Sequence, residues 1–149
     1  MKISRRCDYA IRSMIYLCLS SDKSEPVGVL EIAKEQNIPL KFLSAILFEL
    51  KKAKYISSKK GPGGGYRLEC NPNDINIEHV IKLIDGEINQ YAIDFSSSAT
   101  SQSVNSSQVV KEVLDEIEKE TRLVMQKLTL KELTTRYLKL CEEDIDYSI

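Results

Sequence analysis

The most restrictive feature of the sequence is a glycine-rich segment at residues 59–65, Lys-Lys-Gly-Pro-Gly-Gly-Gly. It separates two short runs of strand-like composition, residues 55–58 and 66–68. Clustered glycine and proline interrupt regular structure, so the three pieces are predicted to form a β-hairpin with a broad tip. Lysines at its base and glycines at its tip would bring charge and bare backbone close to a polyanion, and the hairpin is interpreted as a wing.

The same glycines raise the alternative of a phosphate-binding loop for a nucleotide. That loop requires Gly-x-x-x-x-Gly-Lys-Ser/Thr at the start of a helix. Here Gly65 is followed by Tyr66, Arg67 and Leu68, which is a strand pattern. Nucleotide binding is therefore disfavoured.

Three helices are predicted before the hairpin, at residues 5–20, 29–36 and 40–53, from apolar residues three or four positions apart. Leu30 is expected to face inward, and Phe42 and Leu43 are expected to anchor the third helix to the core. Pro39 restrains itself and the residue before it, so residues 37–39 predict a tight break. Two short helices joined by such a turn predict a helix-turn-helix.

The second half predicts a short helix at 77–84, a flexible Ser-rich loop, a long helix at 108–128, and a last short helix from Thr129 with a frayed acidic tail. A helix of about 20 residues is about 30 Å long and reaches beyond a small winged-helix body. Its apolar seam is therefore interpreted as a dimerisation surface. The seam residues are Val110, Val113, Leu114, Ile117, Thr121, Val124 and Leu128.

The fold class predicted from these elements is mainly α with a small β-hairpin wing. Residues 1–86 are assigned to a winged helix-turn-helix domain, 87–107 to the loop, and 108–149 to the dimerisation and C-terminal helices.

Charge is also distributed unevenly between the two halves of the chain. Residues 1–67 carry 13 Lys and Arg against 6 Asp and Glu, whereas the rest carries 8 against 16. A basic half suits a polyanion and an acidic half suits another protein, although chance asymmetry is the alternative.

Several other classes of protein are disfavoured. No apolar run approaches the length of a membrane span and no signal peptide is recognised, so a cytoplasmic protein without membrane contact is expected. His79, the one histidine, has no catalytic partner at a recognisable spacing, and it is interpreted as a surface residue of a protein that is not an enzyme. Cys7, Cys18, Cys70 and Cys141 have no metal-site spacing; Cys18 is expected to be buried, whereas Cys7 and Cys70 are expected near exposed element ends.

Several segments together resemble the Rrf2 family of bacterial regulators: residues 1–4 and 8–12, 50–53 in the third helix and, most specifically, Gly-Pro-Gly-Gly-Gly-Tyr at 61–66. The resemblance implies a homodimeric repressor or activator of transcription. It also implies that the third helix enters the major groove of DNA, that the wing reaches the minor groove, and that the long helix forms the dimer.

Several members of that family hold an iron–sulfur cluster on three cysteines before the long helix. Residues 71–140 of this chain contain no cysteine, and serines occupy the loop instead. A neutral hydroxyl is a poor iron ligand, so no cofactor and no metal ligand are predicted. Asp8 matches a cluster-ligand position of one member, and here it is interpreted as a charge at a helix N-terminus.

Roles within the DNA-binding half are predicted from residue chemistry. The iron–sulfur regulator of the family has Glu-Gln where this chain has Ser44 and Ala45, so a different operator is expected. Lys41 and Ser44 are expected to supply specificity, and Lys60 is expected to supply mainly non-specific affinity. The alternative for Ser44 is that it is only a small residue that permits close packing on DNA or protein. The candidate DNA-binding residues are Lys2, Arg5, Lys41, Phe42, Ser44, Ala45, Lys51, Lys59, Lys60, Gly61, Gly63 and Gly64.

The function predicted from the sequence is a sequence-specific, homodimeric transcription regulator that binds double-stranded DNA, with repression as the expected mode. The alternative is a winged-helix protein–protein interaction module that has lost specific DNA binding. Lys59 and Lys60 argue against that alternative, because positive charge at the wing suits contact with the phosphates of DNA. An effector or partner protein is left open.

Overall fold

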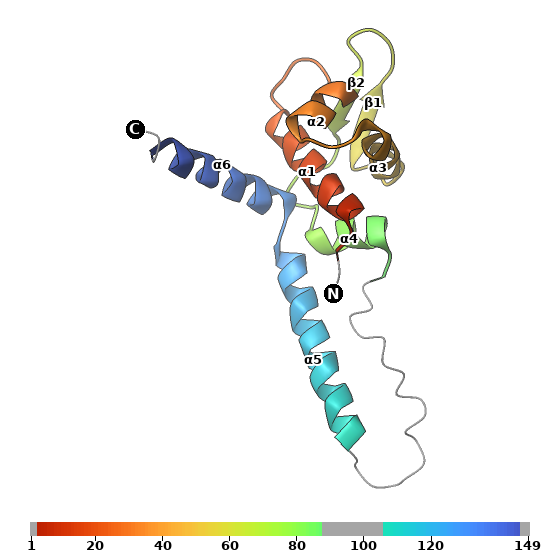
Figure 1. The fold of residues 1–149 in the computed structure, drawn as a ribbon, viewed down its shortest axis with the longest axis vertical. Helices are drawn as coiled ribbons and strands as arrows, with labels where there is room; N and C mark the ends of the chain where they lie inside the picture. Colours follow the sequence, from red (N-terminus) through yellow and green to blue (C-terminus); the bar gives the residue numbers. More distant parts are fainter. Residues whose placement is uncertain (1–2, 88–105, 147–149) are drawn as a thin grey trace.

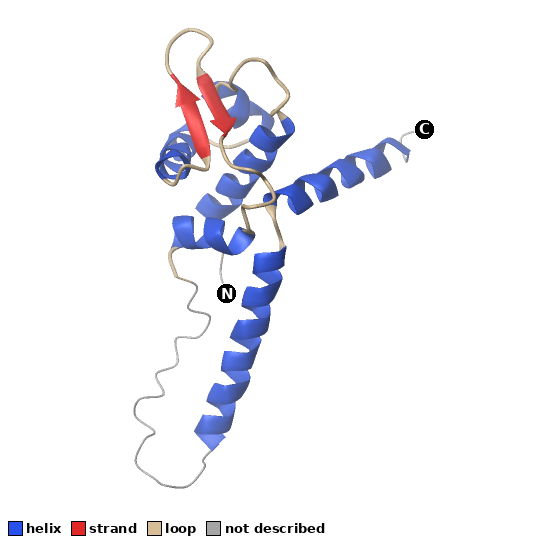
Figure 2. Ribbon diagram, turned by 180° about the vertical axis from the view of Figure 1, so that it is seen from behind, coloured by secondary structure: helices blue, strands red, loops and turns tan. Residues whose placement is uncertain are grey.

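The structure is a computed structural model that describes residues 3–87 and 106–146. It is mostly helical with one two-stranded hairpin (Figures 1 and 2), which confirms the predicted fold class. The elements are α1 (Arg5–Leu19), α2 (Val29–Glu35), α3 (Leu40–Lys52), β1 (Ile56–Lys59), β2 (Gly65–Leu68), α4 (Ile77–Asp85), α5 (Ser106–Lys127) and α6 (Leu130–Asp146). Most boundaries lie within two residues of those predicted.

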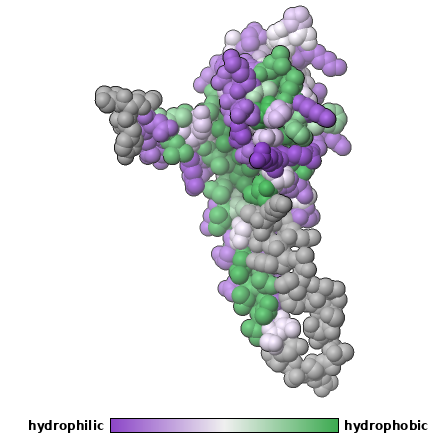
Figure 3. Space-filling view, viewed as in Figure 1, coloured by the Kyte–Doolittle hydropathy of each residue, from purple (hydrophilic) through white to green (hydrophobic). Residues whose placement is uncertain are grey.

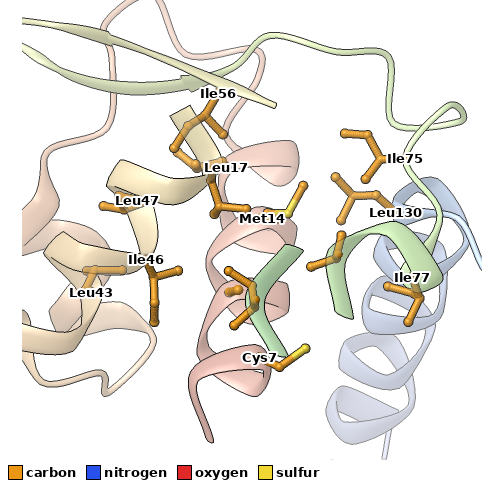
Figure 4. Packing of buried hydrophobic residues seen from close by; sticks show 14 of the residues in the cluster. Cys7, Met14, Leu17, Leu43, Ile46, Leu47, Ile56, Ile75, Ile77 and Leu130 are labelled. Carbon is orange, nitrogen blue, oxygen red and sulfur yellow. The ribbon is translucent and has the colours of Figure 1, made fainter. Parts of the chain in front are cut away.

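Helix α1 is the centre of the packing. Ser4 caps its first turn, where the Ser4 side chain accepts a hydrogen bond from the Cys7 backbone N–H. One stripe of α1, which includes Met14 and Leu17, is buried against α3, α4, β2 and the start of α6 (Figure 4). On the α3 side the stripe meets Leu43, Ile46, Leu47 and Leu50. This single core holds the helix-turn-helix and the wing in a fixed relation.

The hairpin forms because β1 and β2 pair antiparallel, with Ile56 opposite Leu68 and Lys59 opposite Gly65. Val27 adds a bridge to Tyr66 through two backbone hydrogen bonds of 2.9 and 2.8 Å. A side chain at Gly65 would collide with the backbone of Val27 at this bridge, so glycine is required there. The base of the wing is thereby fastened to the start of α2.

Helix α5 projects from the body (Figure 1), and only its C-terminal part, including the buried Met125, packs against α4 and the core. Helix α6 begins in the core at Leu130, where it contacts α1, and then extends away from the body. The prediction of a short last helix is wrong, because α6 continues to Asp146 and includes the first part of the tail predicted to fray from 142; residues 147–149 lie outside the described residues. No helix within the described ranges 3–87 and 106–146 is both long and apolar enough to cross a membrane.

Three side-chain expectations are also wrong. Leu30 is 68% exposed and Phe42 is 50% exposed, because α2 and α3 bury Ile32 and Leu43 instead and leave their neighbours on the outside. Cys7 is fully buried, because it starts the apolar stripe of α1 that continues through Ala10 and Met14. The Ser-rich loop predicted at 87–107 lies almost entirely outside the described residues, and the assigned domain boundaries remain a prediction.

Candidate nucleic-acid interface

The turn between α2 and α3 is fixed by local backbone geometry. Asn37 takes a left-handed conformation with a φ of 49°, which asparagine tolerates better than most residues. The Ile38 N–H donates to the Ala33 carbonyl at 2.9 Å, and Arg12 of α1 donates to the Gln36 carbonyl at the end of α2. The second helix of the pair, α3, is therefore held at a defined angle to α1 and α2.

Helix α3 divides into a buried and an exposed face. Lys41, Ser44 and Ala45 are all exposed, and their contacts with DNA stay a prediction. The Ser44 hydroxyl donates to the Leu40 carbonyl at 3.0 Å, so its oxygen remains as an acceptor toward solvent. Phe42 is exposed on the flank of this face rather than buried, and its candidate DNA contact stays a prediction.

A cleft of about 350 Å³ lies between the end of α3 and the wing, and it joins predicted residues that are distant in sequence. Lys51 of α3 lines it together with Lys59 and Lys60 at the base of the wing. Three lysines around one cleft produce a positive surface of the kind that attracts phosphate groups. The lining residues are Val29, Lys51, Ser58, Lys59, Lys60, Gly64, Gly65 and Tyr66.

Gly61 and Gly63 lie at the exposed tip of the wing with φ values of 89° and 68°, which favour glycine. Arg5 is exposed in the first turn of α1 but does not line the cleft. Lys2 lies outside the described residues. The structure thus brings together Lys51, Lys59, Lys60 and Gly64. Contacts of Lys2 and Arg5 with DNA stay a prediction.

Other cations of the basic half are engaged within the protomer. Arg6 pairs with Glu49 at 2.7 Å, and Lys23 pairs with Glu31 at 2.7 Å. The hydrogen bond from Lys23 is the main reason that the pKa of Glu31 lies below its usual value. No ion pair within 4.0 Å joins Lys51, Lys59 or Lys60 to another described residue, so the charge of the cleft is not neutralised by the part of the chain that is described.

Sequence reasoning missed five residues of this surface. Val29, Ser58, Gly65 and Tyr66 line the cleft, and Phe48 is exposed on α3. Gly65 and Tyr66 belong to the predicted hairpin, but no sequence pattern showed that they line a cleft with Val29, since only folding places α2 beside the hairpin. Phe48 did carry a signal, because it stands one turn after Ala45 on the outward face.

The predicted dimer seam lies on the projecting helix α5 (Figure 3), where an apolar strip follows the helix. Val110, Val113, Ile117 and Val124 are exposed, whereas Leu114 and Thr121 are partly covered. Leu128 differs from the expectation: it follows the last residue of α5 and packs against the core of its own protomer. The strip from 110 to 124 is therefore an apolar surface that this protomer does not bury.

The four cysteines lie in separate parts of the described chain, in α1, after β2 and in α6. Burial, with help from Asp85 and Asp8, raises the pKa of Cys7 to about 12, so this thiol stays protonated. The Cys70 thiol donates to the Lys54 carbonyl, and Asp8 pairs with Arg12 at 3.3 Å. Among residues 3–87 and 106–144, no three His, Cys, Asp or Glu side chains gather as metal ligands. The residues present do not fit a three-cysteine cluster, because the segment 71–140 contains no thiol.

Comparisons with known proteins agree with this fold. Residues 3–136 match the family model described as Rrf2, iron-dependent transcriptional regulator. The HTH-type transcriptional regulator IscR of Vibrio atlanticus (strain LGP32) is 38% identical over 88 residues, which are 59% of this chain and 50% of the relative. The chain thus spans about half the length of the curated relatives that it matches.

Two solved structures resemble nearly the whole chain. CymR (YrzC), the global cysteine regulator of B. subtilis, superimposes with a TM-score of 0.76 at 23% identity, covering 91% of this chain and 98% of that one. The oxidized form of Staphylococcus aureus CymR gives a TM-score of 0.69 at 27% identity, with 90% and 96% covered. The fold is therefore that of winged-helix regulators, and since the family model covers most of its length, this chain belongs to the Rrf2 family.

Proposed function

We propose that this protein is a sequence-specific DNA-binding transcription regulator that acts as a homodimer. The observation that carries the proposal is the cleft in which Lys51 of α3 meets Lys59 and Lys60 of the wing. A surface of this kind sits beside the exposed face of the second helix of a helix-turn-helix, which is the helix that enters the major groove in such proteins. The family membership supports the same assignment.

The division of labour follows from residue chemistry. The cleft lysines would neutralise backbone phosphates and supply affinity that does not depend on sequence. The exposed face of α3, with Lys41 and Ser44, would face the base edges. Because the Ser44 oxygen remains free to accept, it suits an amino group of adenine or cytosine better than a carbonyl.

Dimerisation is part of the proposal because α5 leaves an apolar strip exposed. Valine and isoleucine side chains at 110, 113, 117 and 124 would be covered by the same helix of a second copy. Two copies would then present two α3 helices to half-sites about 34 Å, or one helical turn, apart. Occupation of a promoter by such a dimer would block transcription, and repression is the proposed mode.

The test is a titration of fluorescent duplex DNA at several salt concentrations. Binding through phosphate contacts requires log affinity to fall with log salt, by about 0.9 per contact. Lys51→Ala is expected to reduce this slope, whereas Lys139→Ala on the remote helix α6 is the matched control and should not. Binding that is absent, or insensitive to salt, would favour the protein–protein module instead.

A further inference from the structure

An aromatic side chain stands on the outward face of α3. Phe48 is 67% exposed although it lies in the middle of the helix. Ala45 precedes it by three residues, and Lys51 and Lys52 follow by three and four, so all four lie on one side of the helix. The buried residues Leu43, Ile46, Leu47 and Leu50 lie on the opposite side. The core of the protomer is complete without Phe48.

The surroundings of Phe48 are positive. The neighbouring Glu49 is the one acidic residue of α3, and its carboxylate is engaged by Arg6 at 2.7 Å. Lys51 also lines the positive cleft beside the wing. An apolar ring flanked by lysines does not match the usual core of a protein–protein interface, where lysine is depleted. It does match a surface that meets phosphates on either side of an apolar contact.

We propose that Phe48, together with the Ala45 methyl group, contacts the C5-methyl group of a thymine in the major groove of the operator. This inference rests on the proposed function and adds a side chain that recognises one base. Among the four bases, only thymine presents a methyl group in the major groove, and phenylalanine and alanine are side chains that meet it there. Lys51 and Lys52 would hold the helix against the flanking phosphates.

The experiment begins with selection of the operator from random duplexes by the wild-type protein. Each thymine is then replaced, one at a time, by deoxyuridine, which removes the methyl group and keeps the pairing edge and the O4 acceptor. We expect one thymine in each half-site at which the replacement weakens binding by about fourfold, the value of one buried methyl group. Replacement at the other thymines should have little effect.

The matched variants connect the loss to Phe48. Phe48→Ala should weaken binding to the operator, lose the response to deoxyuridine at that position, and keep the salt slope, because no phosphate contact is removed. Phe48→Leu keeps an apolar group and should keep part of the response. Leu140→Ala removes an apolar side chain of similar exposure, 61%, from α6 and should leave the response intact.

The outcomes separate this inference from the proposed function. If the wild type binds the selected operator with a salt-dependent affinity but no thymine responds, or if Phe48→Ala keeps the full response, the inference is wrong and the proposed function stands. If the wild type binds no duplex, the proposed function fails and the inference fails with it. A response that Phe48→Ala abolishes and Leu140→Ala preserves establishes the contact.

Discussion

Arg122 of α5 approaches the carboxylate of Glu78 in α4 to 3.6 Å, although Glu78 is only 2% exposed. Lys82 pairs with the same carboxylate at 2.9 Å, and Gln126 of α5 donates a hydrogen bond to it at 2.7 Å. The buried carboxylate therefore fastens the projecting helix to the body of the protomer through two partners on α5, an ion pair with Arg122 and a hydrogen bond from Gln126. Its partners favour the charged form, with Lys82 contributing most, and lower the pKa of Glu78 despite burial.

Glu78→Gln should reduce the free energy of unfolding by about 1–3 kcal/mol, because charge-assisted hydrogen bonds at a buried site are replaced by weaker ones. Chemical denaturation monitored by circular dichroism measures the change. Glu116→Gln, at an exposed position of α5, is the matched control and should differ from wild type by less than about 0.5 kcal/mol. Equal effects of the two substitutions would show that Glu78 does not anchor the helix.

The pH dependence of the same contact has a defined sign. Since the folded-state pKa of Glu78 lies below the unfolded value of about 4.5, the folded protein holds the proton less tightly than the unfolded chain. The stabilisation is fully present above pH 4.5 and is lost as the pH falls through the lower folded-state pKa. The difference in unfolding free energy between wild type and Glu78→Gln should therefore shrink as the pH falls from 4.5 through the folded-state pKa of Glu78.

The order of helices and the hairpin could be predicted from the sequence because each depends on local patterns. The spacing of Met14 and Leu17, or the glycines after Lys60, can be interpreted without knowledge of distant residues. The same local pattern could not show that Phe42 lies outside the core, because α3 offers more apolar residues than one buried face accepts. The length of α6 was missed because its acidic end gives no apolar signal and the leucines before it, Leu138 and Leu140, are exposed rather than packed on the body.

The wing lysines were predictable from composition, but the cleft was not. Val29, Lys51 and Tyr66 come from three separate elements, and the bridge between Val27 and Tyr66 brings α2 beside the hairpin. The role of Glu78 was hidden for a similar reason: it lies 44 and 48 positions before its partners Arg122 and Gln126. Tertiary contacts of this separation leave no periodic signal in a single sequence.

Ile117→Asp should convert the protein to a monomer and abolish tight operator binding. The substitution places a charge in the apolar strip of α5, at a cost of several kcal/mol when the strip is covered by a second copy. Sedimentation velocity gives the oligomeric state, and the DNA titration gives the affinity. Lys119→Asp places an aspartate on another exposed side of α5, with an even larger change of charge, and should remain dimeric. A dimeric Ile117→Asp protein would contradict the assigned seam.

The protein purified under anaerobic conditions should contain no iron–sulfur cluster. Residues 71–140 contain no cysteine, and the buried Cys7 has a pKa near 12, far from that of a ready thiolate ligand. A visible absorption spectrum together with iron and sulfide assays decides the point. Stoichiometric iron and sulfide would overturn this expectation and require ligands other than a three-cysteine set.

Lys60 and Ser44 should affect DNA binding in different ways. Lys60 lines the positive cleft, so Lys60→Ala should weaken binding to the selected operator and to random duplexes by a similar factor. The salt slope should fall by about 0.9 for each lost phosphate contact. Ser44 lies on the exposed side of α3, which is proposed to face the bases. Ser44→Ala should narrow the difference in binding free energy between operator and random DNA by about 1 kcal/mol while leaving the salt slope unchanged. Fluorescence anisotropy at three salt concentrations measures both quantities for each variant. If Lys60→Ala removes the discrimination and Ser44→Ala leaves it intact, the wing reads the sequence and the roles assigned to the two residues are reversed.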